Sequence, residues 1–127
     1  SKAMLDKAVE YSKERKQFNR VIGSFQAVKH MCAEMASELE PCYSLVWHAA
    51  HSFDNNEENR KLMACHAKSH VSDVSKMVSK KATEVHGGMG FTDLLGLHFW
   101  FKRIGVNRHL LGSPEIVRGE AAKIQGL

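Results

Sequence analysis

The chain has 127 residues, about one domain with a single buried core, and carries a formal net charge of +4. Its apolar fraction of 43% and charged fraction of 25% exclude a disordered chain, and no apolar run approaches the ~20 residues that cross a bilayer. The positive charge suits a phosphate-bearing small molecule, whereas the absence of a dense Lys/Arg tract argues against nucleic acid as a partner.

The three cysteines, Cys32, Cys42 and Cys65, are odd in number and have no C-x-x-C spacing. This pattern indicates neither a disulfide framework nor a cysteine-based zinc site, and it favours a reducing compartment. The chain opens directly with a helical pattern and has no signal-peptide features, so we expect a fragment of a longer protein.

The first predicted helix spans Ser1 to about Lys16, because apolar residues recur at helical spacing and charged residues fill the other face. Residues 17–23 break that period and are predicted to form a loop. Ser24 is a good N-cap residue and should begin the second helix.

The second predicted helix carries the clearest pattern and is expected to run for about 30 residues. Pro41 lies inside it, and we expect a local bend near Ser37 to Glu40 rather than a break. The predicted buried positions are Val28, Cys32, Met35, Leu39, Cys42, Val46, Ala49 and Phe53.

A polar turn at residues 54–57 separates this helix from a third, which should start near Asn56 and run to about His86. Its predicted buried positions are Leu62 or Met63, Ala67, Val71, Val74, Val78, Ala82 and Val85.

A fourth helical segment is predicted from Leu94 to His109, and Ser113-Pro114-Glu115 is a strong start signal for a fifth that ends near Gln125. No strand is predicted. The fold class is therefore all-α: an up-and-down four-helix bundle with an additional C-terminal helix, in one domain over residues 1–127.

Three glycines within four positions, at Gly87, Gly88 and Gly90, are more than a helix end requires. One interpretation is a plain turn between helices, which this spacing alone favours. The other is a turn whose exposed backbone N–H groups hold an anion such as a phosphate.

The histidine pairs His66/His70 and His48/His51 have spacings that place two imidazoles on one helix face. No acidic third ligand completes a metalloprotease pattern, so we interpret them as surface histidines and predict no metal site. No nucleophile motif is present.

Glu14-Arg15-Lys16-Gln17-Phe18 places two cations, an amide and an aromatic ring at a helix end. Such a group suits a phosphate beside a planar ring, although alone it would be an ordinary charged turn.

Four blocks together resemble the C-terminal helical domain of the acyl-CoA dehydrogenases: residues 11–18 with R-x-x-F-like spacing, Ile22-Gly23-Ser24-Phe25-Gln26, His86-Gly87-Gly88-Met89-Gly90-Phe91, and residues 112–118. Their order and spacing match the family over nearly the whole chain. The resemblance implies that an N-terminal helical domain and a middle β domain precede this one in the full enzyme, and that FAD is the cofactor.

The resemblance also implies which residues bind FAD. Those facing the FAD of the neighbouring subunit would be Arg15, Gln17, Phe18, Phe25, Gln26, Glu84, Val85, His86, Gly87 and Gly88. Ser113 and Glu115 would approach the FAD of their own subunit. The family usually has Gln where Glu84 stands, and a carboxylate there is unfavourable beside a pyrophosphate unless it turns away or is protonated.

Leu111 is the largest departure from the family pattern. In much of the family a Glu at this position removes the substrate's α-proton while the β-hydrogen leaves as hydride to the flavin, and a leucine cannot accept a proton. We therefore predict no catalytic residue in this chain. Some members place the Glu on the helix that precedes the present Ser1.

The resemblance implies α,β-desaturation of an acyl-CoA thioester, electron transfer to an electron-transfer flavoprotein and a homo-oligomer built as a dimer of dimers. The expected compartment is the bacterial cytoplasm or the mitochondrial matrix. The alternative is a catalytically silent helical subunit that serves assembly and cofactor binding, or an isolated bundle without activity.

Overall fold

Apolar residues at helical spacing produce five α-helices in the computed structural model, which describes residues 1–127. The helices are α1 (Lys2–Glu14), α2 (Gln26–Asp54), α3 (Arg60–His86), α4 (Leu97–His109) and α5 (Pro114–Ile124). Three 3₁₀ turns connect them: η1 (Ile22–Ser24), η2 (Gly87–Phe91) and η3 (Asp93–Leu95). No helix is both long and apolar enough to cross a membrane.

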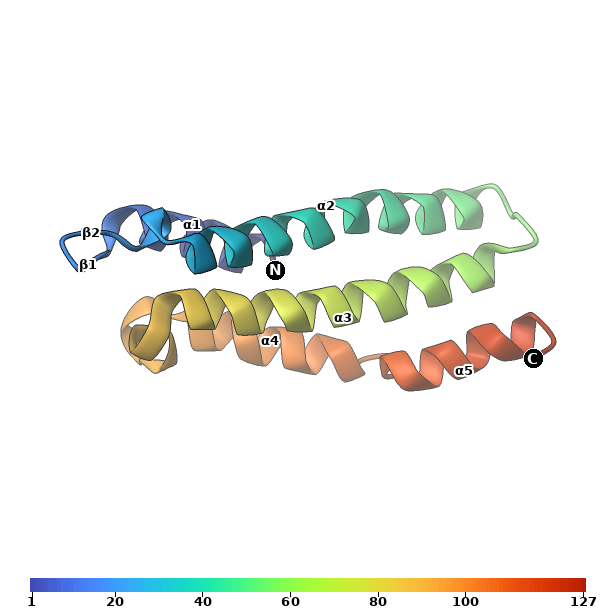
Figure 1. The fold of residues 1–127 in the computed structure, drawn as a ribbon. Coiled ribbons are helices and arrows are strands. Elements are labelled where there is room, and N and C mark those ends of the chain that lie inside the picture. The colour runs from blue at the N-terminus through green and yellow to red at the C-terminus, as the bar shows by residue number, and fades with distance from the viewer.

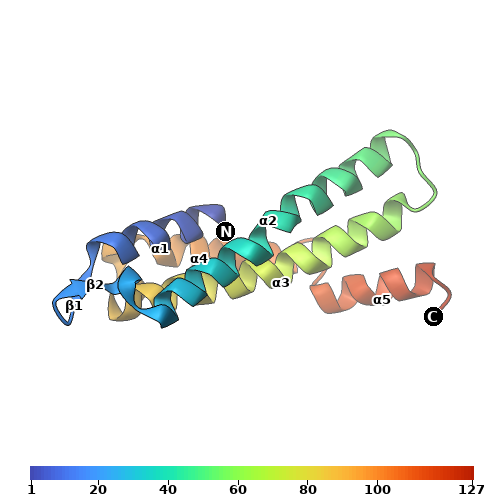
Figure 2. The same cartoon turned by 45° about the horizontal axis from the view of Figure 1, so that its top comes forward.

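Helix α3 is the centre of the bundle, because it packs against α1, α2, α4 and α5. The short connection after α2 makes α2 and α3 antiparallel neighbours, and α1 and α4 complete a four-helix bundle along one half of their length (Figures 1 and 2). Helix α5 lies along the other half of α3 (Figures 1 and 2). The predicted all-α bundle with an additional C-terminal helix is confirmed.

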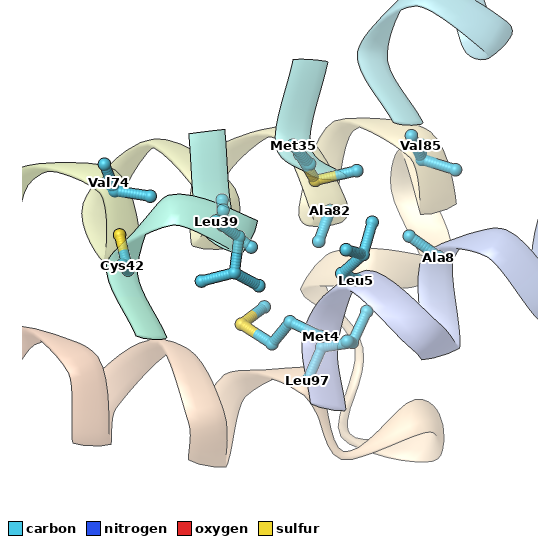
Figure 3. Packing of buried hydrophobic residues seen from close by; sticks show 11 residues of the cluster. Met4, Leu5, Ala8, Met35, Leu39, Cys42, Val74, Ala82, Val85 and Leu97 are labelled. Carbon is cyan, nitrogen blue, oxygen red and sulfur yellow. The ribbon is translucent and has the colours of Figure 1, made fainter. Parts of the chain in front are cut away.

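Four helices contribute to one apolar core, shown in Figure 3. Full burial of a large apolar side chain contributes about 1.5–3 kcal/mol each, so these contacts fix how the helices pack. The buried members are Met4, Leu5, Ala8, Met35, Leu39, Cys42, Val74, Val78, Ala82, Val85 and Leu97.

The predicted buried stripe of α2 fails at two positions. Val46 and Phe53 are each 48% exposed. Val46 lines a hollow together with Ser1, at the point where α1 begins and beyond which α2 has no α1 to pack against. Helical spacing identifies a face of α2 but not how far its neighbour extends along it.

A small hairpin replaces the loop predicted at residues 17–23, so the prediction of no strands is wrong here. Strands β1 (Lys16–Gln17) and β2 (Arg20–Val21) pair antiparallel, with Lys16 opposite Val21 and Gln17 opposite Arg20. The two connecting residues, Phe18 and Asn19, both have positive φ, as a tight two-residue hairpin requires. Two-residue strands are too short to produce a periodic pattern, which is why the sequence did not indicate them.

Three helix starts also differ from the prediction. The Ser24 hydroxyl donates to the Val21 carbonyl inside η1, at 2.7 Å, so Phe25 rather than Ser24 is the N-cap of α2. Helix α3 begins at Arg60 rather than near Asn56. The φ of Asn56 is 53°, a left-handed conformation that cannot form part of a right-handed α-helix. Helix α4 begins at Leu97, because η3 and the left-handed Gly96 occupy the preceding residues. Helix α2 continues through Pro41.

Candidate functional site

The hairpin presents cations and an aromatic ring at one end of the bundle. Helix α1 ends at Glu14, and the Arg15 carbonyl accepts a hydrogen bond from the Ile22 N–H at 2.8 Å, which closes the hairpin. Arg15 and Gln17 are exposed, and Phe18 is 85% exposed on a backbone with φ of 51°. A non-glycine residue at positive φ is uncommon and costs roughly 1 kcal/mol or more, so the exposed ring of Phe18 is held in a strained position.

Phe25 joins this surface. Its ring packs edge to face on Phe18, with centroids 6.1 Å apart, and the Arg20 guanidinium lies 3.9 Å from the Phe25 centroid. Each such contact is worth about 0.5–1 kcal/mol at an exposed site. Gln26 follows as the exposed first residue of α2. The five predicted residues Arg15, Gln17, Phe18, Phe25 and Gln26 therefore belong to one connected segment at one end of the bundle.

The glycine turn lies at the same end of the bundle as the hairpin (Figures 1 and 2). Two of its glycines have structural reasons. Gly87 ends α3 with φ of 58°, and a Cβ at Gly90 would lie 2.6 Å from the Thr83 carbonyl oxygen. Gly88 has neither reason, because its φ is not positive and a Cβ there would meet nothing within 4 Å. Gly88 is therefore the one glycine of this turn that neither backbone conformation nor close packing explains. Its lack of a side chain leaves space beside the turn.

His86 ties the glycine turn to helix α1. Its ring stacks on Tyr11 with centroids 4.5 Å apart, and its Nδ1 donates to the Ala82 carbonyl at 2.7 Å. Burial lowers the pKa of His86, the Ala82 hydrogen bond opposes this, and nearby Lys7 adds to it. Val85 is also buried, so the side chains of Val85 and His86 face the core of the bundle and not the surface.

Glu84 points away from the buried side of α3 and lines a hollow of about 290 Å³. Three lysines, one acid and one methionine share that hollow: Lys76, Lys80, Lys81, Asp73 and Met77. The lining of this hollow is mainly cationic, and Lys81 within it pairs with Glu34 of α2 at 2.7 Å.

Ser113 and Glu115 lie elsewhere, where α4 ends and α5 begins (Figure 1). Ser113 is the N-cap of α5, and Glu115 lies in its first turn, where the positive end of the helix favours an acid. Between the two helices, Leu111 is 91% exposed with φ of 60°, and Gly112 has φ of 105°. The structure therefore divides the predicted site residues into two groups, one at the hairpin end and one at the α4–α5 corner.

An ion-pair network missed by sequence reasoning lies beside the second group. Arg108 donates to Asp73 at 2.5 Å and to Glu115 at 2.6 Å, and Arg118 also pairs with Asp73. These partners come from α3, α4 and α5, and Asp73 is 35 residues from Arg108 in sequence. Only the tertiary fold brings them together.

The two acids of this network have lowered pKa values. Burial alone would raise the pKa of Asp73, but hydrogen bonds from Arg118 and Arg108 outweigh it. The Ser113 hydroxyl, the Glu115 backbone N–H and Arg108 lower the pKa of Glu115. Both groups therefore favour the folded chain when they are ionised.

A pH dependence of stability follows for Asp73. Because its folded pKa lies below its unfolded value of 3.8, its contribution is complete above that value and is lost as the pH falls through the folded pKa. We expect Asp73→Asn to lower the free energy of unfolding at neutral pH by about 1 kcal/mol, a figure reduced for solvent screening of a partly exposed group. Urea unfolding from pH 7 to pH 2 measures this.

The comparison with the unmodified chain is the control, because the contribution of His86, which lies outside the network, is common to both proteins and cancels in the difference. Glu115 shares Arg108 with Asp73, so its contribution is part of the measured difference. The difference in unfolding free energy should shrink toward zero at acid pH. A difference that stays constant down to the lowest pH would contradict the ionic role of Asp73.

The histidines do not gather into a metal site. His66 and His70 line a hollow with Leu45, Ser69 and Arg118. No group of three or more His, Cys, Asp or Glu side chains in the structure could hold a metal ion. The cysteines are free, and burial raises the pKa values of Cys32 and Cys42.

Comparison with known proteins identifies the family of this chain. The family model for the acyl-CoA dehydrogenase C-terminal domain matches residues 1–125. The caffeyl-CoA reductase-Etf complex subunit CarC of Acetobacterium woodii is 42% identical over 87 residues, which cover 68% of this chain and 23% of CarC.

Solved structures of relatives have the same fold. Butyryl-CoA dehydrogenase from Megasphaera elsdenii superposes with a TM-score of 0.92 at 26% identity, covering 99% of this chain and 33% of that one. The FAD complex of PigA superposes with a TM-score of 0.90 at 26% identity, covering 98% of this chain and 32% of that one. The chain thus spans about a third or less of the length of these relatives.

Proposed function

Because this chain belongs to the acyl-CoA dehydrogenase family and matches its C-terminal domain, we propose that its hairpin end binds the FAD of a neighbouring subunit in a full-length acyl-CoA dehydrogenase. The observation that carries the proposal is the position of the hairpin and the glycine turn at one end of the bundle, tied together by the Tyr11–His86 stack. Cations, an exposed ring and an open backbone turn suit the phosphates and flat rings of such a cofactor.

Each residue has a defined part in the proposed site. Arg15 and the Gln17 amide would hold phosphate or ribose oxygens, while Phe18 and Phe25 would lie against ring systems and Gln26 would contact the adenosine side. The glycine turn at Gly87 and Gly88 would lie against the pyrophosphate, with Val85 and His86 fixing its position as the last residues of α3, and Gly88 supplies the open space that close approach needs. Glu84 would stand beside it in the hollow that it shares with Lys76 and Lys80.

Ser113 and Glu115 would contact the FAD of their own subunit. Their separation from the hairpin end, along the axis of the bundle, supports two different flavins rather than one (Figure 1). A subunit that contributes to two flavins requires at least a dimer, and we propose the dimer of dimers that the family resemblance implies.

The proposed reaction is α,β-desaturation of an acyl-CoA thioester, for which a bound FAD would supply the acceptor of the β-hydrogen. Leu111 has no group that can accept the α-proton. The proton acceptor of the full-length enzyme would therefore come from outside this chain, as would its N-terminal helical and middle β domains. By analogy with CarC, named as a subunit of an Etf complex, the electron partner would be an electron-transfer flavoprotein.

A catalytically silent subunit is the second candidate, and the exposed Leu111 is the observation that favours it. Such a subunit would use the same hairpin end to hold a partner's FAD and would lack proton chemistry of its own. The two candidates share the cofactor site and differ only in turnover.

The test is anaerobic titration of the full-length flavoprotein with a panel of acyl-CoA thioesters of different chain length and branching. We expect loss of the oxidised flavin absorbance with at least one member, together with the matching enoyl-CoA product. FAD-loaded protein that stays oxidised with every thioester would contradict the desaturase proposal and favour the silent subunit. Because CarC is named a reductase, the same protein should also be tested for enoyl-CoA reduction.

A further inference from the structure

The corner between α4 and α5 is a tight turn in which Leu111 occupies a position with left-handed backbone conformation that normally favours glycine. Leu110 has φ of −62° and ψ of 129°, Leu111 has φ of 60°, and the Gly112 N–H donates to the His109 carbonyl at 3.2 Å. These values describe a type II turn, which favours glycine at the position that Leu111 occupies. A leucine in this conformation persists only where the surroundings hold it there.

Helix α3 holds the first side of this turn. The Lys68 ammonium donates to the Asn107 carbonyl at 2.6 Å and lies 3.4 Å from the Arg108 carbonyl, so it satisfies the last turn of α4. Carbonyls at a helix end have no partner within the helix, and a cation there is doubly favourable.

Helix α3 also holds the second side. Asp73 accepts from Arg108 on α4 and from Arg118 on α5, and Arg108 donates to Glu115 on α5. The Arg108 side chain is 13% exposed and Asp73 is 39% exposed, so the Arg108–Asp73 pair is partly shielded from solvent, whereas Glu115 and Arg118 are 65% and 54% exposed. Asp73 is therefore the group on α3 that joins the helix before the turn to the helix after it.

The strained backbone of Leu111 thus lies between two helices that are joined by ion pairs. The charged groups around the turn, Lys68, Asp73, Arg108, Glu115 and Arg118, are referred to below as the corner clamp. The turn itself carries Leu111 fully outward and leads directly into Ser113, which the proposed function assigns to a flavin contact.

We propose that Asp73 is a positioning residue: through the corner clamp it holds Leu111 in the left-handed conformation and so fixes the corner that faces the substrate and flavin. The proposal rests on the proposed function for the direction of that corner. The positioning itself concerns only this chain and can be tested without turnover.

The test is a double-mutant cycle in the full-length holoenzyme with Asp73→Asn, Leu111→Gly and both changes together. The first readout is hydrogen exchange of the backbone amides in residues 110–113, followed by mass spectrometry. Asp73→Asn should speed this exchange roughly tenfold, because the left-handed leucine loses its support. Leu111→Gly should return the double variant to within about threefold of the original protein, because glycine adopts positive φ without strain.

Leu110→Gly is the matched control, since Leu110 already has negative φ and glycine removes no strain there. In the Asp73→Asn background it should leave the fast exchange in place. Unchanged exchange in Asp73→Asn, or rescue by glycine at 110 as good as at 111, would overturn the clamp.

The second readout is the rate of flavin reduction by the best acyl-CoA, which a purely structural role would not move. It should fall about five- to tenfold in Asp73→Asn at unchanged FAD content, and glycine at 111 should reduce the effect of Asp73→Asn to less than about twofold. If hydrogen exchange changes across the four proteins as expected but the rate of flavin reduction is the same in all of them, the positioning role is wrong. A protein that holds no FAD would refute the proposed function instead, and the exchange data would still decide whether the clamp holds Leu111.

Discussion

Replacing Leu97 by alanine is expected to lower the free energy of unfolding of the chain by about 2–5 kcal/mol, the usual cost of emptying a filled core position. Leu97 is fully buried and is the first residue of α4. It lies beside Met4 of α1 in the core (Figure 3), so its loss removes the contact that anchors the start of α4. Urea unfolding followed by helical circular dichroism measures the change.

Leu94→Ala is the matched control, because Leu94 precedes Leu97 by one turn of chain and is 82% exposed. The same chemical change should alter the unfolding free energy by less than about 0.5 kcal/mol there. Equal effects at the two positions would mean that α4 does not dock on α1 and α3 as described.

Replacing Gly90 by alanine is the second change with a large expected effect. A Cβ at this position would lie 2.6 Å from the Thr83 carbonyl oxygen, and backbone must move to relieve the contact. We expect a loss of about 1–3 kcal/mol in the free energy of unfolding, as for other overpacked sites. Thermal and urea unfolding of the variant measure it.

Gly88→Ala provides the contrast within the same turn. Its Cβ would meet open space, and its backbone does not require glycine, so stability should change by less than about 0.5 kcal/mol. A destabilisation equal to that of Gly90→Ala would refute the assignment of different reasons to these two glycines.

The sequence predicted the buried residues of a helix correctly where neighbouring helices cover its apolar face. Val74, Val78, Ala82 and Val85 of α3 are buried as expected, because α3 has neighbours on every side of that stripe. Val46 of α2 repeats at the same spacing but lies where no helix covers it. Periodicity reports a helix's face, and only the packed neighbours decide how much of that face is buried.

Short local structure was predicted less well. Phe18-Asn19 is not one of the glycine-containing pairs that signal a two-residue hairpin, yet the chain forms one. Ser24 is a residue type that often caps helices, but its hydroxyl donates a hydrogen bond to the Val21 carbonyl instead. The turn η1, which contains Ser24, packs against both α1 and α2, and such contacts are not visible in a local sequence pattern.

The candidate site was predicted in part, through resemblance and not through physics alone. The residues alone gave Arg15 to Phe18 and the glycine turn as two separate candidate phosphate sites, and only the resemblance assigned both to one FAD. The fold places both at the same end of the bundle. The ion pairs of Asp73 could not be predicted from the sequence. Their partners Arg108 and Arg118 lie 35 and 45 residues away, and only the packing of α4 and α5 on α3 selects them among the other cations of the chain.

The most direct test of the central claim is the FAD affinity of the full-length protein with Gly88→Ala. The control is Gly119→Ala, the same change on α5, where a Cβ also meets nothing within 4 Å. We predict that Gly88→Ala raises the FAD dissociation constant at least tenfold, a loss of about 1.4 kcal/mol, with stability unchanged, and that Gly119→Ala leaves affinity unaltered. Equal FAD affinity in both variants and the original protein would contradict the assignment of the glycine turn to the cofactor.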